Sequence, residues 1–450
     1  MLAVLVELLS YLTFSLAGTD DIELAILETI EAPNRHPVEP KALHEVAEWP
    51  PEKGRDFAQA PHWDSMVAAG SLPPVEKRLP ENPLVIIPIE QLGPYGGTLT
   101  RVGTGPQDVG ILEARLCYES LVRWDPMARG VRPNLATHWE IDDDGRTFTF
   151  HLRRGVRWSD GHHFTANDIL FWYEDVLQNP DLTPIVPRFL TRGGELMRLE
   201  KLDDYTIRIR FKEPYSLFVK IVASDHGQFH LSTRHAAHYL KQFHPRYVSK
   251  QRMRQILKEE NKDLWPQVFA DKTDYRNVEM PRLWAWITDQ PPPARPAVFI
   301  RNPYYWKVDP EGRQLPYIDR ISFEIHNVET INLKAINGEI GMQGRHISFQ
   351  NYSLFMSNAK KGGYRVHHWL DEGDESMGFG FNFHHKDPVL KKLFHDRRFR
   401  FAMSHAIDRD AINQAFFGGK GIPVHNHAFV PTRSYWNPEW DKNFAKEYGY

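Results

Sequence analysis

Adjacent histidines are the first residues of this sequence whose type and spacing suggest chemistry. The chain holds 22 histidines, with neighbouring pairs at 162–163, 367–368 and 384–385. Neighbouring side chains point to opposite faces of a strand and diverge by about 100° on a helix. Metal ligands on one element usually follow i, i+4 spacing, and the HExxH motif is absent. The pairs therefore favour structural or surface histidines, and we predict no metal site and no cofactor.

Other motifs that would indicate catalysis are incomplete. Asp142-x-Asp144-Gly145 lacks the later ligand positions of a calcium loop, which favours a simple turn. Gly103-Thr-Gly105 is followed by Pro106 and lacks the third glycine of a dinucleotide fingerprint. The sequence has neither a GxSxG elbow nor a Walker loop. Its single cysteine, Cys117, excludes an internal disulfide and a cysteine-based zinc site. We therefore expect a binding protein and not an enzyme.

Composition sets the broad class of the protein. Lys and Arg number 55 against 58 Asp and Glu, a formal charge of −3, which argues against a nucleic-acid partner. Hydrophobic residues at 41% and aromatic residues at 12% supply a real core and exclude wholesale disorder. A length of 450 residues fits about three domains or one large two-lobed unit.

The amino-terminal part of the chain has two segments of different composition. Residues 1–18 form an apolar run broken only by Glu7. This run is either a secretory signal without the usual charged start or an ordinary amphipathic or buried helix. Residues 19–90 follow, and 12 of the 33 prolines fall between Pro33 and Pro94. Little periodicity is sustained there, so we expect an extended proline-rich arm or a wrapping linker.

Strand and helix patterns alternate irregularly after Gly96. Period-2 alternation on both sides of the Asp142–Gly145 turn predicts a β-hairpin within 138–158. Thr165-Ala-Asn-Asp168 predicts a capping box at the start of a helix. Further patterns predict strands at 205–211 and 321–325, a helical stripe at 399–407, and a helix end at Gly418-Gly419. This mixture favours an α/β or α+β protein with several lobes over a bundle or barrel.

A series of sequence blocks also occurs in a recognisable order. The blocks are YGGTL at 95–99, LCYESLVRWDP at 116–126, PNLATHWEIDDDGRTFTFHLRRGVRWSDGHHFTANDILFWYED at 133–175, DDYTIRIRFKEPY at 203–215, RNPYYWKVDPEGRQLPYID at 301–319, INGEIG at 336–341, RRFRFAMSHAIDRDAIN at 397–413 and EYGY at 447–450. Together they resemble the family 5 extracellular solute-binding proteins, the peptide, dipeptide and nickel-type receptors of ABC importers. Residues 68–86 resemble a long-chain subgroup of that family.

The resemblance implies a mixed α/β, two-lobed fold of the periplasmic binding-protein type with an extra domain, spanning 91–450. The implied parts are lobe I at about 91–123 and 200–365, the extra domain at about 124–199, and a partial lobe II at about 366–450. Closure of such lobes by a hinge is stabilised by contacts that the ligand makes only in the closed form. The implied protein is a monomer in the periplasm or another extracytoplasmic space, near its transporter.

The resemblance also implies a set of ligand-binding residues. Two stretches, 104–109 and 343–346, match the cleft positions where peptide receptors of the family hold the ligand backbone. The candidates are Gln107, Asp108, Gln343, Arg345, His346 and Trp436. Arg345 is expected to meet a ligand carboxylate, with a surface or interlobe salt bridge as the alternative. Asp108 would face a ligand amine, and Trp436 forms either a pocket wall or part of the core.

In the family, the chain continues beyond the residues that correspond to Gly449-Tyr450. That later segment completes lobe II and supplies its ligand-anchoring aspartate, so the resemblance implies an incomplete second lobe with uncovered apolar faces. We expect a receptor that delivers oligopeptides to an ABC permease and, indirectly, its ATPase. The alternatives are an oligosaccharide receptor of the same fold, suggested by 13 tryptophans, a nonfunctional truncated remnant, and a metal enzyme or hydrolase that uses the histidines.

Overall fold

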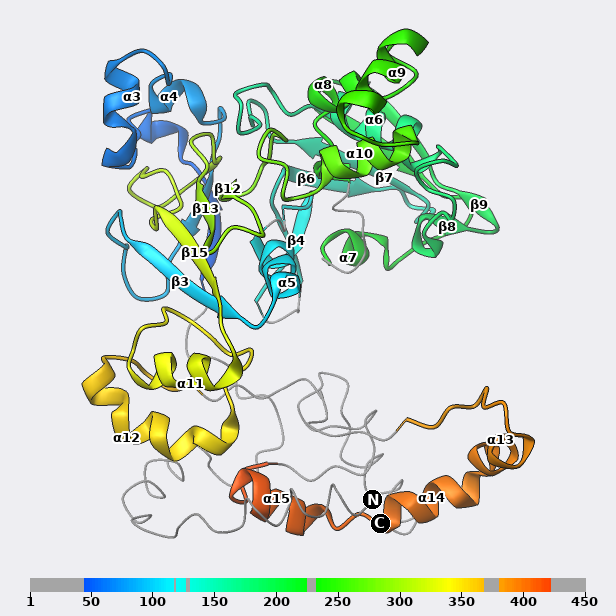
Figure 1. The fold of residues 1–450 in the computed structure, drawn as a ribbon. Coiled ribbons are helices and arrows are strands. Elements are labelled where there is room, and N and C mark those ends of the chain that lie inside the picture. Colours follow the sequence, from blue (N-terminus) through cyan, green and yellow to red (C-terminus); the bar gives the residue numbers. More distant parts are fainter. Residues whose placement is uncertain (1–43, 117–118, 127–129, 225–231, 368–379, 422–450) are drawn as a thin grey trace. The chain divides into compact units, whose positions relative to one another are not determined.

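The computed structural model of the protein (Figure 1) describes residues 44–116, 119–126, 130–224, 232–367 and 380–421. Within these ranges the chain forms two compact units. The larger unit contains residues 44–331 and 339–346, and the smaller contains 332–338 and 347–421. The apolar run at 1–18 lies outside the described residues. The lobe boundaries predicted near residues 124, 200 and 366 stay predictions.

Residues 44–90 belong to the segment expected to form an extended arm or a wrapping linker, and they form short regular elements and a small core within the larger unit. Strands β1 (Glu45–Glu48) and β2 (Leu84–Ile87) pair antiparallel, and β2 runs parallel to β14 (Lys307–Val308). Between β1 and β2 lie the short helices η1 (Pro51–Lys53), η2 (Pro61–Trp63), α3 (Asp64–Ala68) and α4 (Val75–Arg78). Apolar side chains from this segment pack with one from β14 in a small core, which comprises Trp49, Phe57, Val75, Leu79, Val85 and Val308. Proline begins η1 and η2, where its missing N–H costs no helical hydrogen bond.

The predicted hairpin is confirmed and lies at one edge of an antiparallel sheet. The sheet has the order β10 (Arg198–Asp203), β11 (Thr206–Arg210), β7 (Thr147–Leu152), β6 (Ala136–Ile141). Gly145 has a φ of +64°, and its N–H donates to Asp142 O at 2.8 Å, which closes the turn. Phe148 and Phe150 are almost fully buried, and the Phe148 ring lies 4.9 Å from that of Phe218 in α7 (Phe218–Val222).

Helices gather beside this sheet, and several of them contribute side chains to the largest hydrophobic core of the larger unit. Figure 1 shows α6 (Ala166–Phe171), α8 (Ala237–Leu240), α9 (Lys250–Glu259) and α10 (Trp265–Thr273) gathered beside β6 and β7. A π-helical turn, η3 (Trp172–Leu177), continues α6. Trp172 is only 2% exposed, so this aromatic residue packs in the core.

The predicted capping box at the start of α6 is present. The Thr165 hydroxyl accepts from Asn167 N at 3.2 Å, and Asp168 Oδ2 accepts from Thr165 N at 2.9 Å. The second oxygen of Asp168 accepts from Ala237 N at 2.9 Å, which fixes α8 against α6. One capping residue therefore connects two helices that lie far apart in the sequence.

Thr165→Ala removes one of these hydrogen-bond acceptors and leaves a first-turn amide without it. We expect the free energy of unfolding to fall by about 0.5–2 kcal/mol. Thr165→Ser keeps the oxygen and serves as the matched control, so its loss should be smaller. Urea denaturation of the three proteins measures the difference, and equal stability of all three would contradict the assignment.

The second large sheet carries the segment in which we expect ligand contacts. Its strand order is β12 (Trp286–Gln290), β13 (Ala297–Arg301), β15 (Arg320–Ile325), β3 (Thr98–Gly103), and β15 runs parallel to β3. Ile321 and Phe323 of β15 are buried, which confirms the strand predicted there. Gly103 pairs with Ile325, so both strands end at the same edge of the sheet. Helix α5 (Pro106–Leu116) begins directly after that edge.

The remaining elements of the larger unit are short. They are β4 (Val122–Trp124), β5 (Val131–Pro133), η4 (Arg188–Leu190), β8 (Thr191–Arg192), β9 (Glu195–Leu196) and η7 (Lys241–Phe243). Helix α11 (Val328–Ile336) runs from the larger unit into the smaller one.

The smaller unit is helical in its described part. Its elements are η8 (Phe349–Asn351), α12 (Tyr352–Gly362), α13 (Pro388–His395), α14 (Arg397–His405) and α15 (Arg409–Phe417). The predicted end of the last helix is confirmed, because Gly418 has a φ of +55°. The apolar stripe of α14 is incompletely buried, with Met403 41% exposed. Across the described ranges, none of the helices combines the length and apolar character needed to cross a bilayer.

Candidate functional site

The candidate site is built around Asp108, in the first turn of α5 at the edge where β3 ends. The chain turns from strand to helix through Thr104 and Gly105. A Cβ on Gly103 would lie 2.6 Å from the Asp108 Cβ, so only glycine allows the carboxylate to fold back over the strand end. The short motif Gly103-Thr-Gly105, which is too incomplete to bind a dinucleotide, therefore shapes a turn around an acidic residue.

The Asp108 side chain is only 2% exposed and is surrounded by donors. Oδ2 lies 2.7 Å from Thr104 N, 3.2 Å from Thr104 Oγ1 and 2.9 Å from His346 Nε2, and Oδ1 lies 2.7 Å from Arg345 Nε. Burial alone raises the pKa of this carboxyl group. The hydrogen bonds from the Thr104 amide, Arg345 and His346 outweigh burial and hold the pKa well below its usual range. Asp108 is therefore ionised at neutral pH.

Gln343 connects the second candidate stretch to β3. Its Nε2 donates to Val102 O at 3.1 Å and to Arg345 O at 2.7 Å, and its Oε1 accepts from Arg101 Nε at 3.2 Å. Since β3 is an edge strand, these bonds also satisfy part of its open side. The stretch is thus held in a defined position before any ligand binds.

The structure brings four of the six predicted site residues together: Asp108, Gln343, Arg345 and His346. Gln107 is exposed in the same helical turn as Asp108. Trp436 lies outside the described residues. Arg101 joins the group without a sequence signal that marks it, because it is one polar residue in an otherwise ordinary strand.

Arg345 is the member of this group that remains open to a ligand. Its side chain is 47% exposed, and its Nε is the atom bonded to Asp108. Within the described residues, neither Nη atom forms a hydrogen bond. A guanidinium held through Nε presents both Nη groups in a fixed plane, a geometry that suits a carboxylate.

Acid should weaken the contribution of Asp108 to stability. Because its folded pKa is lowered, the stabilisation is complete above its unfolded pKa of about 3.9 and is lost as pH falls through the folded value. We expect the stability difference between wild type and Asp108→Asn to be large at pH 7 and to shrink progressively below about pH 5. Urea unfolding of both proteins across this pH range tests the expectation, and a constant difference would contradict it.

Comparison with known proteins identifies the family. The profile of the bacterial extracellular solute-binding proteins, family 5 Middle, matches residues 130–449. The chain belongs to this family. This confirms the resemblance inferred from the ordered sequence blocks.

Individual relatives agree with this assignment. The periplasmic alpha-galactoside-binding protein of Rhizobium meliloti (strain 1021) is 28% identical over 398 residues, which cover 81% of this chain and 54% of that protein. The structure of the oligopeptide-binding protein OppA is 40% identical with a TM-score of 0.71, and the match covers 87% of this chain and 61% of that one. The predicted mixed α/β fold of the periplasmic binding-protein type is thereby confirmed.

A third relative is a complex with a sugar. The periplasmic binding protein MelB from Agrobacterium fabrum C58, solved with stachyose, is 25% identical with a TM-score of 0.56, and the match covers 90% of this chain and 63% of that one. The chain thus spans between about half and two thirds of the length of these three relatives.

Proposed function

We propose that the protein carrying this sequence is an extracytoplasmic receptor that binds oligopeptides and delivers them to an ABC permease. The observation that carries the proposal is the state of Arg345, which is fixed by Asp108 and leaves two donor groups open. A free peptide carboxylate is the ligand group that this geometry fits best. The 40% identity to the oligopeptide-binding protein OppA supports the same ligand class.

In this proposal the site residues have different roles. Arg345 contacts the ligand carboxylate, whereas Asp108, His346 and Gln343 position the guanidinium and its loop. The Asp108 carboxylate already has four donor contacts and is buried, so we assign it no ligand amine. Exposed Gln107 supplies a further polar contact beside Arg345. Binding needs no bond-breaking step, so we propose no catalysis.

The wider role follows from the family. A receptor of this kind acts outside the cytoplasm, as a monomer, and passes its solute to the permease whose ATPase drives import. Closure of two lobes around the peptide would distinguish loaded from empty receptor, because only the closed form makes both sets of contacts. The Rhizobium relative is a periplasmic protein, which supports this location.

An oligosaccharide ligand is the second candidate. It is favoured by the alpha-galactoside-binding relative and by the stachyose complex of MelB. Arginine and glutamine side chains also bind sugar hydroxyl groups, so the polar atoms of the site suit this ligand as well. A sugar, however, offers no carboxylate to Arg345.

Calorimetric titration distinguishes the two ligand classes. A mixture of tri- to pentapeptides and, separately, stachyose are titrated into the purified protein. The proposal expects heat of saturable binding with the peptides and none with stachyose. Binding of stachyose alone would replace the peptide assignment with the sugar assignment.

A further inference from the structure

A second group of polar side chains lies on the β6–β7 hairpin, outside the candidate ligand site. His138 and His151 are directly paired across the two strands, and their rings stack with centroids 4.1 Å apart and an interplanar angle of 7°. Glu140 follows His138 by two residues and therefore shares its face of the sheet. One ring nitrogen of each histidine and one Glu140 oxygen all lie within 4.8 Å of one another.

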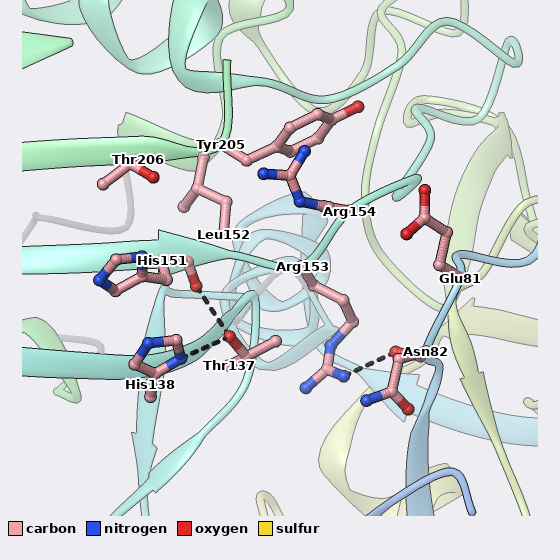
Figure 2. A pocket seen from close by; sticks show the side chains of 10 residues that line it. All are labelled: Glu81, Asn82, Thr137, His138, His151, Leu152, Arg153, Arg154, Tyr205 and Thr206. Atoms are coloured by element: carbon pink, nitrogen blue, oxygen red, sulfur yellow. Dashed lines mark hydrogen bonds between the residues drawn. The ribbon is translucent and has the colours of Figure 1, made fainter. Parts of the chain in front are cut away.

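A β-bulge places a hydrogen-bond partner beside the His138 ring. The register shifts between Ala136 and His138, so Thr137 is an extra residue beside the His138–His151 pair. Figure 2 shows the Thr137 hydroxyl between His138 Nδ1, at 2.9 Å, and His151 O, at 3.3 Å. A carbonyl oxygen only accepts, so the single hydroxyl hydrogen goes to His151 O. Both contacts are satisfied together only when the hydroxyl also accepts from His138 Nδ1–H, and this arrangement leaves the lone pair of a neutral His138 on Nε2.

His151 has an unsatisfied ring nitrogen. Its Nε2 is buried and forms no hydrogen bond with any described residue, and Glu140 Oε1 lies 3.6 Å away. A buried polar atom without a partner costs free energy. Around a tetrahedral ion with bonds of about 2.0–2.1 Å, ligand atoms lie about 3.3 Å apart, close to the 3.6 Å between His151 Nε2 and Glu140 Oε1. Because an ion lies near the plane of each imidazole that binds it, the two stacked rings must rotate out of their parallel arrangement to share one ion.

We propose that His138, Glu140 and His151 bind a divalent first-row transition-metal ion, for which Zn²⁺ is the best fit. Two imidazoles and one carboxylate are a common zinc ligand set, and they leave a fourth position open. The histidines also border a cavity of about 350 Å³ (Figure 2), whose other walls include Arg154 and Tyr205. Water or a ligand group in this cavity can occupy the fourth position. The proposal does not depend on the peptide-binding function.

A second histidine group provides the contrast. Asp160, His162 and His238 also lie close together, but there Asp160 Oδ2 is 2.7 Å from His238 Nε2 and 3.2 Å from His162 Nδ1. These nitrogens already have a hydrogen-bond partner, whereas His151 Nε2 has none among the described residues. The hairpin is therefore the better metal site, and the second group is the natural control.

Zinc binding to the full chain tests the proposal. Equilibrium dialysis with Zn²⁺ alone should show one equivalent bound to wild type, and Co²⁺ should give the intense visible absorption of a tetrahedral site. His151→Gln should abolish this binding, whereas His162→Gln should retain it. Thr137→Val should weaken binding by about 10- to 100-fold because it removes the partner of His138, and Thr137→Ser should restore it.

Circular dichroism in the presence of a chelator confirms that each variant is folded before metal is added. The proposal is overturned if wild type binds no Zn²⁺, if His151→Gln binds it as wild type does, or if His162→Gln abolishes binding.

Discussion

Glu119→Gln is expected to lower the free energy of unfolding by about 3–5 kcal/mol, because it breaks a buried ion pair by removing one charge. Glu119 and Lys307 are 4% and 3% exposed. Lys307 Nζ lies 3.0 Å and 2.9 Å from the two carboxylate oxygens of Glu119. Tyr305 OH and Asn134 Nδ2 donate to the same oxygens at 2.8 Å and 3.0 Å, so the carboxylate is fully surrounded by donors.

The directions of the pKa shifts agree with an ionised pair. Burial alone raises the pKa of Glu119, but the charges of Lys307 and Arg123, together with the hydrogen bonds from Lys307 and Asn134, outweigh burial and the pKa is lowered. Burial lowers the pKa of Lys307 to about 8, even though Glu119 opposes this effect. Glutamine would leave a buried ammonium group opposite a neutral amide. An unpaired buried charge is costly, so the expected loss in the free energy of unfolding exceeds the value of about 1 kcal/mol for a neutral hydrogen bond.

Two controls separate burial from charge. Lys212 and Glu195 form an exposed pair at 2.6 Å, with each side chain 52% exposed, so Glu195→Gln should change stability little. The double variant Glu119→Leu/Lys307→Met removes both buried charges and should recover most of the lost stability. Urea denaturation measures all three. If Glu119→Gln is as stable as wild type, the claim that breaking this buried ion pair destabilises the fold is contradicted.

Arg345→Gln is expected to weaken peptide binding by about 10- to 100-fold, which corresponds to the loss of a charge-assisted hydrogen bond worth about 1.5–3 kcal/mol. Glutamine retains polarity but cannot offer two parallel N–H groups to a carboxylate. Asp108 keeps the donors from Thr104 and His346 in the variant, so the fold around it should persist.

Two matched controls for Arg345→Gln separate charge from ligand contact. One removes a positive charge away from the site, and the other keeps the charge at residue 345 but alters the contact. Arg208→Gln removes an exposed arginine from β11 and should leave the affinity unchanged. Arg345→Lys keeps the charge but loses the planar pair of N–H donors, so its affinity should fall between those of Arg208→Gln and Arg345→Gln. Isothermal titration with one tripeptide provides the measurement. Equal affinities of wild type and Arg345→Gln would exclude a role for this side chain in binding.

Local physics explains which features of the fold could be predicted from the sequence. The hairpin around Gly145 and the capping box at Thr165 each depend on a few neighbouring residues, and both are confirmed. The folded state of residues 44–90 was not predictable in this way, because β2 pairs with β14, which lies more than 200 residues away. Proline content alone therefore indicated an arm where the structure has part of a core.

The candidate sites show the same distinction between local and distant contacts. The family resemblance selected both Asp108 and Arg345 but assigned each of them to the ligand. Their mutual contact, across 237 residues, appears only in the structure. Histidine adjacency in the sequence does not indicate the hairpin pair, because His138 and His151 come together only across two strands. In the hairpin register Ile141 lies opposite Phe148. Three residues further along each antiparallel strand, His138 lies opposite His151.

The central claim, that Arg345 of this protein binds a peptide carboxylate, is tested most directly by changing both partners. A tripeptide and its C-terminal amide are each titrated into wild type and Arg345→Gln. We predict that wild type prefers the free carboxylate by about tenfold or more and that the variant binds both peptides equally. The account is contradicted if the variant keeps the preference for the carboxylate, or if wild type shows none.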